Sequence, residues 1–317
     1  MKALKFILPA TLLAAGAVPA CDLCNVYSAL EAHGESSKGW HVSLAEQFTH
    51  FGTIQEDSLR MPNTAGQYLN SSVTQIVPGY NVNDWFGVQV NVPFIHRWFR
   101  RTEDLSIDQG SETGIGDLSL VGHVRLVNLQ NKNTTFVWHV LGGVKLPTGD
   151  SRRVAEELNE TPPPPGAIES GIHGHDLALG SGSVDGIIGT AVFSRWHRVF
   201  LSANVQYAAR TKGDFDYQYA DDLTWSGGPG VFLALEENYT ISLEAIVCGE
   251  TKGLDTFMGM TADDTGITAV YVGPQIRFTW KDQLSAEIGI DLPVNIANTS
   301  LQSVPDYRIR GALSFRF

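Results

Sequence analysis

The stretch from residue 114 to residue 147 constrains the fold of this 317-residue chain more than any other part of it. It contains two runs of alternating apolar and polar side chains, separated by a polar break at residues 130–133. In the first run Leu118 and Leu120 share one face, and Asp117 and Ser119 share the other. A period of two residues is that of a β-strand whose faces differ, so two such runs with a short break between them predict a β-hairpin.

The second run, residues 134–147, is long enough to cross a lipid bilayer, since a tilted strand needs about 9 to 11 residues to do so. A soluble sandwich also shows such alternation, so the rest of the chain must decide between the two. The hairpin pattern repeats along the whole chain, and no helical segment is long enough to cover a second sheet face. No run of about eighteen or more apolar residues follows the N-terminus, which excludes spanning helices.

Twelve segments carry the strand pattern, at residues 40–51, 69–82, 85–99, 114–127, 134–147, 179–195, 198–212, 222–236, 239–250, 266–280, 283–293 and 306–317. Short connections fall at residues 81–84, 130–133, 196–197, 236–238 and 281–283. Long connections fall at residues 52–68, 100–113, 148–177, 213–221, 251–265 and 295–304. Short turns alternating with long loops are typical of an even-stranded outer-membrane barrel, with turns in the periplasm and loops outside the cell.

The two faces of the strands assign the inside of this barrel. Arg or Lys on the lipid face at mid-depth would cost about 2 to 4 kcal/mol, so the charged face is expected to line the lumen. The candidate lumen-lining residues are Asp117, His123, Arg125, His139, Lys145, Arg210, Glu244, Arg277, Glu287, Asp291, Arg308 and Arg310. These charges either line an open channel or pair into a closed network, and the pattern alone does not choose. Arg125 and Lys145 are expected to place basic charge along one wall.

Tryptophans mark the ends of the predicted strands. Trp40, Trp85, Trp196 and Trp280 lie near the short-turn end, while Trp98 and Trp225 lie towards the long loops. Aromatic rings of this kind favour both boundaries of a membrane. Two interfacial belts are therefore predicted.

The first twenty residues have the three parts of a secretory signal peptide. Lys2 and Lys5 give a positive start, an apolar stretch follows, and Val18, Pro19 and Ala20 form a small-residue cleavage site. Residues 1–20 are thus predicted to be removed. The next residue is a cysteine, so lipid attachment there is an alternative, although Val18 stands where the lipoprotein pattern prefers Leu.

Residues 21–39 are interpreted as a short periplasmic leader before the barrel domain at residues 40–317. Cys21 and Cys24 form a Cys-x-x-Cys pair, for which a local disulfide in an oxidising compartment is favoured. A metal site is the alternative, with His33 and His41 as the nearby ligands. Asn25 stands where a c-type haem site needs histidine, so no haem is expected.

No reaction site is predicted. Neither His123 nor His139 is followed closely by a serine, as in outer-membrane phospholipases, and no Gly-x-Ser-x-Gly elbow occurs. The longest loop, residues 148–177, could fold into the mouth as a constriction. Its His173, His175 and Asp176 are candidate metal ligands, but solvated histidines of an exposed loop are the competing interpretation.

The chain resembles a known family in several short motifs. The last strand, residues 307–317, ends on an in-phase terminal phenylalanine, which resembles the C-terminal signature by which the assembly machinery recognises outer-membrane barrels. Residues 113–120, 143–150 and 179–189 resemble strand motifs of outer-membrane transporter-like barrels grouped with the phenol meta-degradation pathway. The resemblance implies a barrel that moves small, often apolar or aromatic compounds. It assigns no ligand residues.

The sequence therefore predicts an all-β protein, a closed antiparallel up-and-down transmembrane β-barrel of about twelve strands in the cell outer membrane. The favoured function is passive movement of a small solute through a polar lumen, without enzymatic activity or a cofactor. The alternative is a structural or adhesion barrel with a plugged lumen and partner-binding loops. Expected partners are outer-membrane lipid, the barrel assembly machinery and the solute. The net charge of −12 argues against nucleic acid.

Overall fold

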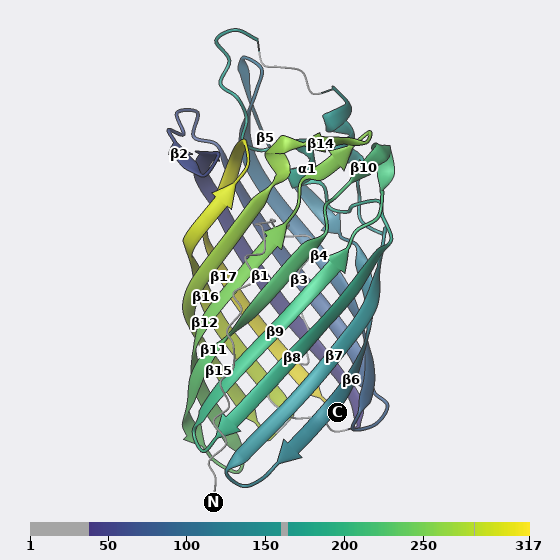
Figure 1. The fold of residues 1–317 in the computed structure, drawn as a ribbon, viewed down its shortest axis with the longest axis vertical. Coiled ribbons are helices and arrows are strands. Elements are labelled where there is room, and N and C mark those ends of the chain that lie inside the picture. Colours follow the sequence, from purple (N-terminus) through teal and green to yellow (C-terminus); the bar gives the residue numbers. More distant parts are fainter. Residues whose placement is uncertain (1–37, 160–163, 282) are drawn as a thin grey trace, which may run out of the picture.

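The barrel is closed by its first and last strands. The computed structural model describes residues 38–159, 164–281 and 283–317. Within these ranges, β1 (Gly39–Glu56) pairs antiparallel with β17 (Leu301–Arg316) along nearly its whole length. The sheet thereby has no free edge, and twelve antiparallel strands surround one lumen (Figure 1). The predicted fold class is confirmed.

Ten further strand positions complete the wall. They are β3 (Tyr68–Asn81), β4 (Phe86–Glu103), β6 (Leu118–Gln130) with its extension β5 (Ser106–Ile115), β7 (Thr134–Leu146), β8 (Asp185–Trp196), β9 (Val199–Ala209), β11 (Asp222–Leu235), β12 (Tyr239–Lys252), β15 (Ile267–Trp280) and β16 (Leu284–Asn298). The first half of β4 pairs with β6 and its second half with β5, so β5 and β6 together occupy one place in the wall.

The remaining elements gather at one end, which is called the loop end below (Figure 1). They are β2 (Leu59–Met61), β10 (Tyr217–Gln218), β13 (Asp255–Phe257), β14 (Met260–Ala262), the 3-10 helices η3 (Arg152–Asn159), η4 (Asp214–Asp216) and η5 (Asp263–Thr265), and α1 (Gly174–Leu177). No helix in the described part of the chain is long and apolar enough to cross a membrane. The opposite end, the turn end, holds the start of β1 and the C-terminus, because Phe317 N donates to Trp40 O at 3.0 Å.

The side chains of the wall are arranged as the alternation predicts. On β4, Phe86, Val88 and Val90 are exposed, whereas Gln89 and Asn91 on the opposite face are buried. Apolar side chains thus face outward and polar side chains inward, the reverse of a soluble protein and the arrangement that lipid requires.

Tight turns lie where the short connections were predicted. At the turn end, His197 joins β8 to β9 with φ 54°, and Lys281 follows β15 with φ 48°. Trp196 and Trp280 are exposed beside these turns, 65% and 43% respectively. Their position fits an aromatic belt at a membrane boundary.

The prediction of a long loop is wrong at two places, where the chain forms a β-hairpin instead. Residues 100–113 continue the ladder as the β4–β5 hairpin, which turns at Asp104. Residues 295–304 form a tight turn at Ser300 between β16 and β17. Both hairpins rise at the loop end, where water is available to both faces, so strand pairing continues after the apolar–polar alternation stops. The predicted strand at residues 179–195 begins only at Asp185, because residues 179–184 turn into the mouth instead.

The predicted signal peptide at residues 1–20, the leader and the Cys21–Cys24 pair lie outside the described residues, except for the last residues of the leader. They stay predictions.

We predict that Val90→Arg lowers the free energy of unfolding by about 2 to 4 kcal/mol, because this exposed position of β4 lies between the predicted belts and would place charge in lipid. Urea unfolding of the barrel in lipid vesicles measures the effect. Val90→Leu is the matched control and should unfold like the unaltered protein. Equal stability of the two variants would contradict the assignment of this face to lipid.

Candidate functional site

The mouth of the barrel is crossed by one segment of the longest loop, residues 164–184, called the mouth segment below. On one side Ser303 N of β17 donates to Gly171 O at 2.6 Å. From β4, Arg97 Nη1 donates to Ala178 O at 2.8 Å. Tyr219 OH, just before β11, donates to His175 O at 3.0 Å. These three contacts come from different parts of the wall, so the mouth segment spans the lumen.

Apolar side chains dock the mouth segment from inside. Ile172 and Leu177 pack with Leu69 of β3 and Phe99 of β4, and both are almost completely buried, at 1% and 0% exposure. Full burial of one such side chain contributes about 1.5 to 3 kcal/mol. The mouth segment is therefore a packed part of the fold. This is the constriction that the length of the loop had suggested.

The short helix α1 contains a buried histidine, His175. His175 Nδ1 lies 3.0 Å from Glu157 Oε1, and its Nε2 lies 3.5 Å from Asp176 Oδ1. Burial opposes the charged form of His175, but the neighbouring carboxylates of Asp176 and Glu157 outweigh it and raise the pKa of His175 well above its usual value. His175 is thus held in its protonated form and ties α1 to η3.

The metal hypothesis for His173, His175 and Asp176 gains no support. Among the described residues no group of three or more His, Cys, Asp or Glu side chains is placed to hold a metal ion. His173 instead lies 3.4 Å from Asp264 Oδ2 and stacks on the ring of His175 at 5.7 Å. The competing interpretation, solvated histidines of an exposed loop, does not hold for His175, which is only 4% exposed.

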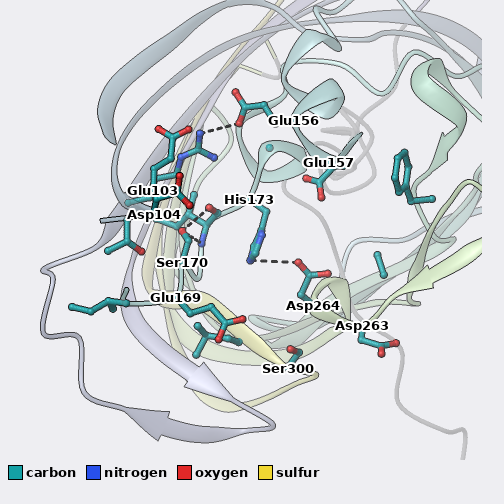
Figure 2. Close-up of a pocket in the computed structure, with 18 of the residues that line it drawn as sticks. Glu103, Asp104, Glu156, Glu157, Glu169, Ser170, His173, Asp263, Asp264 and Ser300 are labelled. Carbon is teal, nitrogen blue, oxygen red and sulfur yellow. Dashed lines mark hydrogen bonds and ion pairs between the residues drawn. The ribbon is translucent and has the colours of Figure 1, made fainter. Parts of the chain in front are cut away.

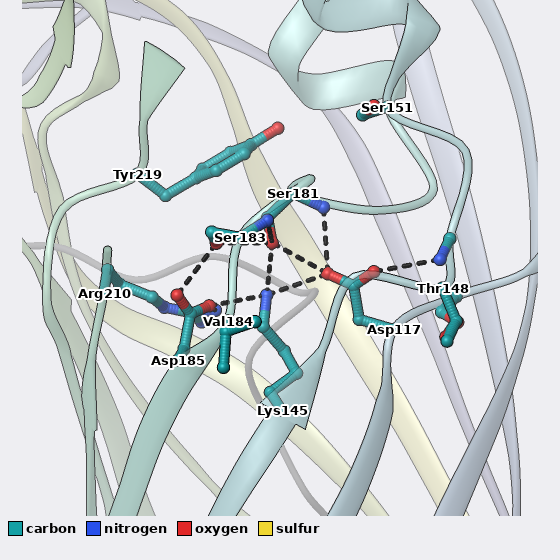
Figure 3. A network of polar contacts seen from close by, with 12 residues as sticks. Asp117, Lys145, Thr148, Ser151, Ser181, Ser183, Val184, Asp185, Arg210 and Tyr219 are labelled. Carbon is teal, nitrogen blue, oxygen red and sulfur yellow. Dashed lines mark hydrogen bonds and ion pairs between the residues drawn. The ribbon is translucent and has the colours of Figure 1, made fainter. Parts of the chain in front are cut away.

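A charged network joins the end of the mouth segment to the wall (Figure 3). Lys145 Nζ of β7 lies 2.8 Å from Asp117 Oδ2 and 2.7 Å from Asp185 Oδ2. It also donates to Ser181 Oγ of the mouth segment at 2.6 Å. Arg210 approaches Asp185 at 2.7 Å from the other side. Of the predicted lumen residues, Asp117, Lys145 and Arg210 therefore belong to one paired network.

A second set of predicted residues pairs around the middle of the lumen. The contacts are Arg277 with Glu287 at 2.6 Å, Arg310 with Asp291 at 2.6 Å, Arg308 with Glu250 at 2.8 Å, and Ser202 Oγ donating to Glu244 Oε1. All of these side chains come from strands, which bring residues far apart in the sequence to one wall.

Several partners in these networks were not predicted. Asp185, Asp222 and Glu250 are buried carboxylates on strands, and Arg97 and Glu157 hold the mouth segment. Glu250 lies on the same face of β12 as the predicted Glu244. Extending the two-residue alternation six residues further along the strand finds it. Glu157 lies in a loop, where no periodic signal exists.

The predicted basic residues at the turn end form a separate group. His123 and Arg125 of β6 and His139 of β7 are buried, at 5%, 4% and 5% exposure. Arg125 lies opposite His139 in the strand register, whereas Lys145 lies opposite Ser119 nearer the loop end. Arg125 and Lys145 therefore lie on the wall formed by β6 and β7 but at different levels, and Lys145 is paired with Asp117 and Asp185.

Three cavities lie in series along the lumen. A vestibule of ≈ 830 Å³ opens at the loop end and is lined by Ile172 of the mouth segment and by carboxylates (Figure 2). The carboxylates are those of Glu103, Asp104, Glu156, Glu157, Glu169, Asp263 and Asp264. A cavity of ≈ 70 Å³ shares Ile172 with the vestibule and Glu250 with a deeper cavity of ≈ 100 Å³. The mouth segment thus separates the vestibule from the two smaller cavities.

No family model matches this chain, and no curated protein sequence does. Among solved structures, an outer membrane channel from Pseudomonas putida F1 is similar, with a TM-score of 0.61 at 10% identity over 92% of this chain and 100% of that one. The β-domain of the Bordetella autotransporter BrkA (TM-score 0.44, 8% identity, 89% and 100% covered) and the Ralstonia pickettii toluene transporter TbuX (0.37, 8%, 90% and 91%) superpose less well.

These likenesses are statements about the fold. At 10% identity the Pseudomonas putida channel shares the barrel architecture with this chain, over almost the full length of both. Together with the closed wall and its apolar outer face, the likeness assigns the chain to the cell outer membrane.

We predict that Lys145→Met lowers the free energy of unfolding by about 3 to 5 kcal/mol, because it leaves the buried carboxylates of Asp117 and Asp185 without their shared cation. The matched control is Lys212→Met, whose exposed pair with Asp216 should contribute no more than about 1 kcal/mol. Urea titration of both variants gives the comparison. Equal losses of unfolding free energy in the two variants would mean that the buried network stabilises the barrel no more than an exposed ion pair does.

Proposed function

We propose that the protein is a channel for passive movement of a small solute across the outer membrane, and that the mouth segment is its gate. The observation that carries the proposal is the series of cavities on both sides of the mouth segment, which share the lining residues Ile172 and Glu250. A barrel built only as a scaffold has no need for such a path. The loop end is proposed to face the outside of the cell.

The centre of the mouth segment is held by a charged side chain of the wall that bonds only to its backbone. That side chain is Arg97, whose guanidinium donates to the carbonyl oxygens of both Asp176 and Ala178. A charged donor on a backbone carbonyl contributes about 1.5 to 3 kcal/mol. Losing it would make displacement of the mouth segment from the lumen less costly, although Ile172 and Leu177 still dock it.

The vestibule suggests how solutes approach. Its seven carboxylates give the loop end a negative potential, which attracts cations and leaves neutral solutes unaffected. A small apolar or aromatic solute is the finer proposal. It is supported by the resemblance of residues 113–120, 143–150 and 179–189 to barrels of the phenol meta-degradation group.

We predict that Arg97→Gln raises single-channel conductance or opening frequency several-fold in planar bilayers, because it releases the mouth segment. Arg152→Gln is the matched control. Arg152 lies in the same loop, is 86% exposed and pairs with Asp150 only at the surface, so its loss should leave conductance unchanged.

Two results would contradict the channel. If neither the unaltered protein nor Arg97→Gln conducts, the structural or adhesion barrel replaces it. If Arg152→Gln opens the barrel as much as Arg97→Gln does, the mouth segment is not the gate.

We predict that the gate opens more often at alkaline pH. The folded pKa of His175 is raised, so the stabilisation from its charge is complete below the unfolded value of about 6.5 and is lost as the pH rises through the folded pKa. Conductance should therefore increase between neutral and alkaline pH. In His175→Gln this increase should disappear, and an unchanged pH profile in that variant would assign the effect to another group.

A further inference from the structure

We propose that the turn end of the lumen contains a binding site for a small monocarboxylate, formed by Arg125, His123, His139 and His41. This goes beyond the proposed channel, because the site lies away from the mouth segment and binds its ligand whether or not the barrel conducts. Each of the four side chains is more than nine-tenths buried.

The strand register brings these side chains together. Arg125 of β6 lies opposite His139 of β7, and His123 follows two residues away on the same inner face. His41 comes from β1, on the other side of β3 and β4. His123 is within electrostatic range of the other three side chains.

Two inward-facing glycines make room for the imidazole rings. A Cβ atom on Gly79 of β3 would lie 2.3 Å from His41 Nε2, and one on Gly87 of β4 would lie 2.4 Å from His123 Cε1. The ring of His41 therefore lies over β3, and the ring of His123 lies over β4. Any larger residue at either glycine would push the ring into the lumen, so the cluster is a built feature of the wall.

Five buried nitrogen atoms of the cluster lack partners among the described residues. Arg125 Nε and Nη1 and the Nδ1 atoms of His41, His123 and His139 have no hydrogen-bond partner among the described residues. A buried guanidinium without an acceptor is unfavourable, since it has lost water and gained nothing in exchange. The site therefore has donors that a bound acceptor would satisfy.

Arg125 is an exception among the predicted lumen arginines. Arg210, Arg277, Arg308 and Arg310 each contact a carboxylate of the chain itself. The acid that acts on Arg125 is Asp84, which lies exposed in the β3–β4 turn, and the positive charge of Arg316 repels Arg125. A carboxylate group of a ligand would give Arg125 the negatively charged partner that the chain itself gives the other four arginines.

The charge of the cluster selects the ligand class. The guanidinium repels a cation, and no three of the described His, Cys, Asp or Glu side chains are placed to hold a metal ion. One permanently charged Arg125, with imidazoles that donate hydrogen bonds in their neutral form, matches a single negative charge better than two.

The test measures binding of benzoate to the purified full-length barrel in detergent micelles by isothermal titration calorimetry. We expect Arg125→Gln to weaken binding at least tenfold. Arg195→Gln is the matched control, because Arg195 is a basic residue at the same end whose guanidinium already donates to Thr135 Oγ1 and His197 O. It should bind benzoate within twofold of the unaltered protein.

A second variant tests the site without changing its charge. Gly87→Ala displaces the ring of His123 and should also weaken binding, so it decides the matter if Arg125→Gln fails to fold. Equal benzoate affinity in the unaltered protein and Gly87→Ala would overturn the site. Sulfate binding more tightly than benzoate would overturn the monocarboxylate assignment. Because no step requires conduction, a barrel that binds benzoate but carries no current retains the site and loses only the channel.

Discussion

The pairing of β1 with β17 is the interaction on which the rest of the structure depends. Hydrocarbon offers no water to an unpaired backbone group, so the first strand must find the last one across the whole chain. Closure then puts most charges of the wall on the inner face, and Glu46 of β1, which shares the outer face with Leu44, accepts hydrogen bonds from Ser72 and Thr74 of β3. The ion pairs of the lumen follow from that confinement, since charges removed from water must find partners inside.

Pairing inside the barrel also explains why the mouth segment is ordered. Asp117 and Lys145 form a buried pair at the loop end of their strands, and Ser181 of the mouth segment joins it. The wall therefore anchors the segment where it returns to β8. The hydrogen bonds from Arg97 and Tyr219 reach backbone carbonyl oxygens and need no particular side chain on the segment, whereas the packing of Ile172 and Leu177 does.

The fold was predictable from the sequence to a greater extent than the site was. Alternation identified which side chains face inward, because the two faces of a strand meet different solvents. Alternation fails where that contrast ends, so it predicts a loop at the β4–β5 hairpin and places the start of β8 too early. Alternation does not predict which charged side chains form ion pairs. The contact of Lys145 with Asp185 depends on the register of β7 with β8, which alternation does not specify.

The distribution of charge along the lumen separates the proposed gate from the proposed binding site. At the loop end, carboxylates line the vestibule, and the cations near the mouth segment are paired. At the turn end, Arg125 and three imidazoles present donors without acceptors among the described residues. The register places Arg125 opposite His139 and Lys145 opposite Ser119, so the two groups occupy different levels of the wall. A change at one level leaves the hydrogen bonds of the other intact, and the two activities should therefore be altered independently.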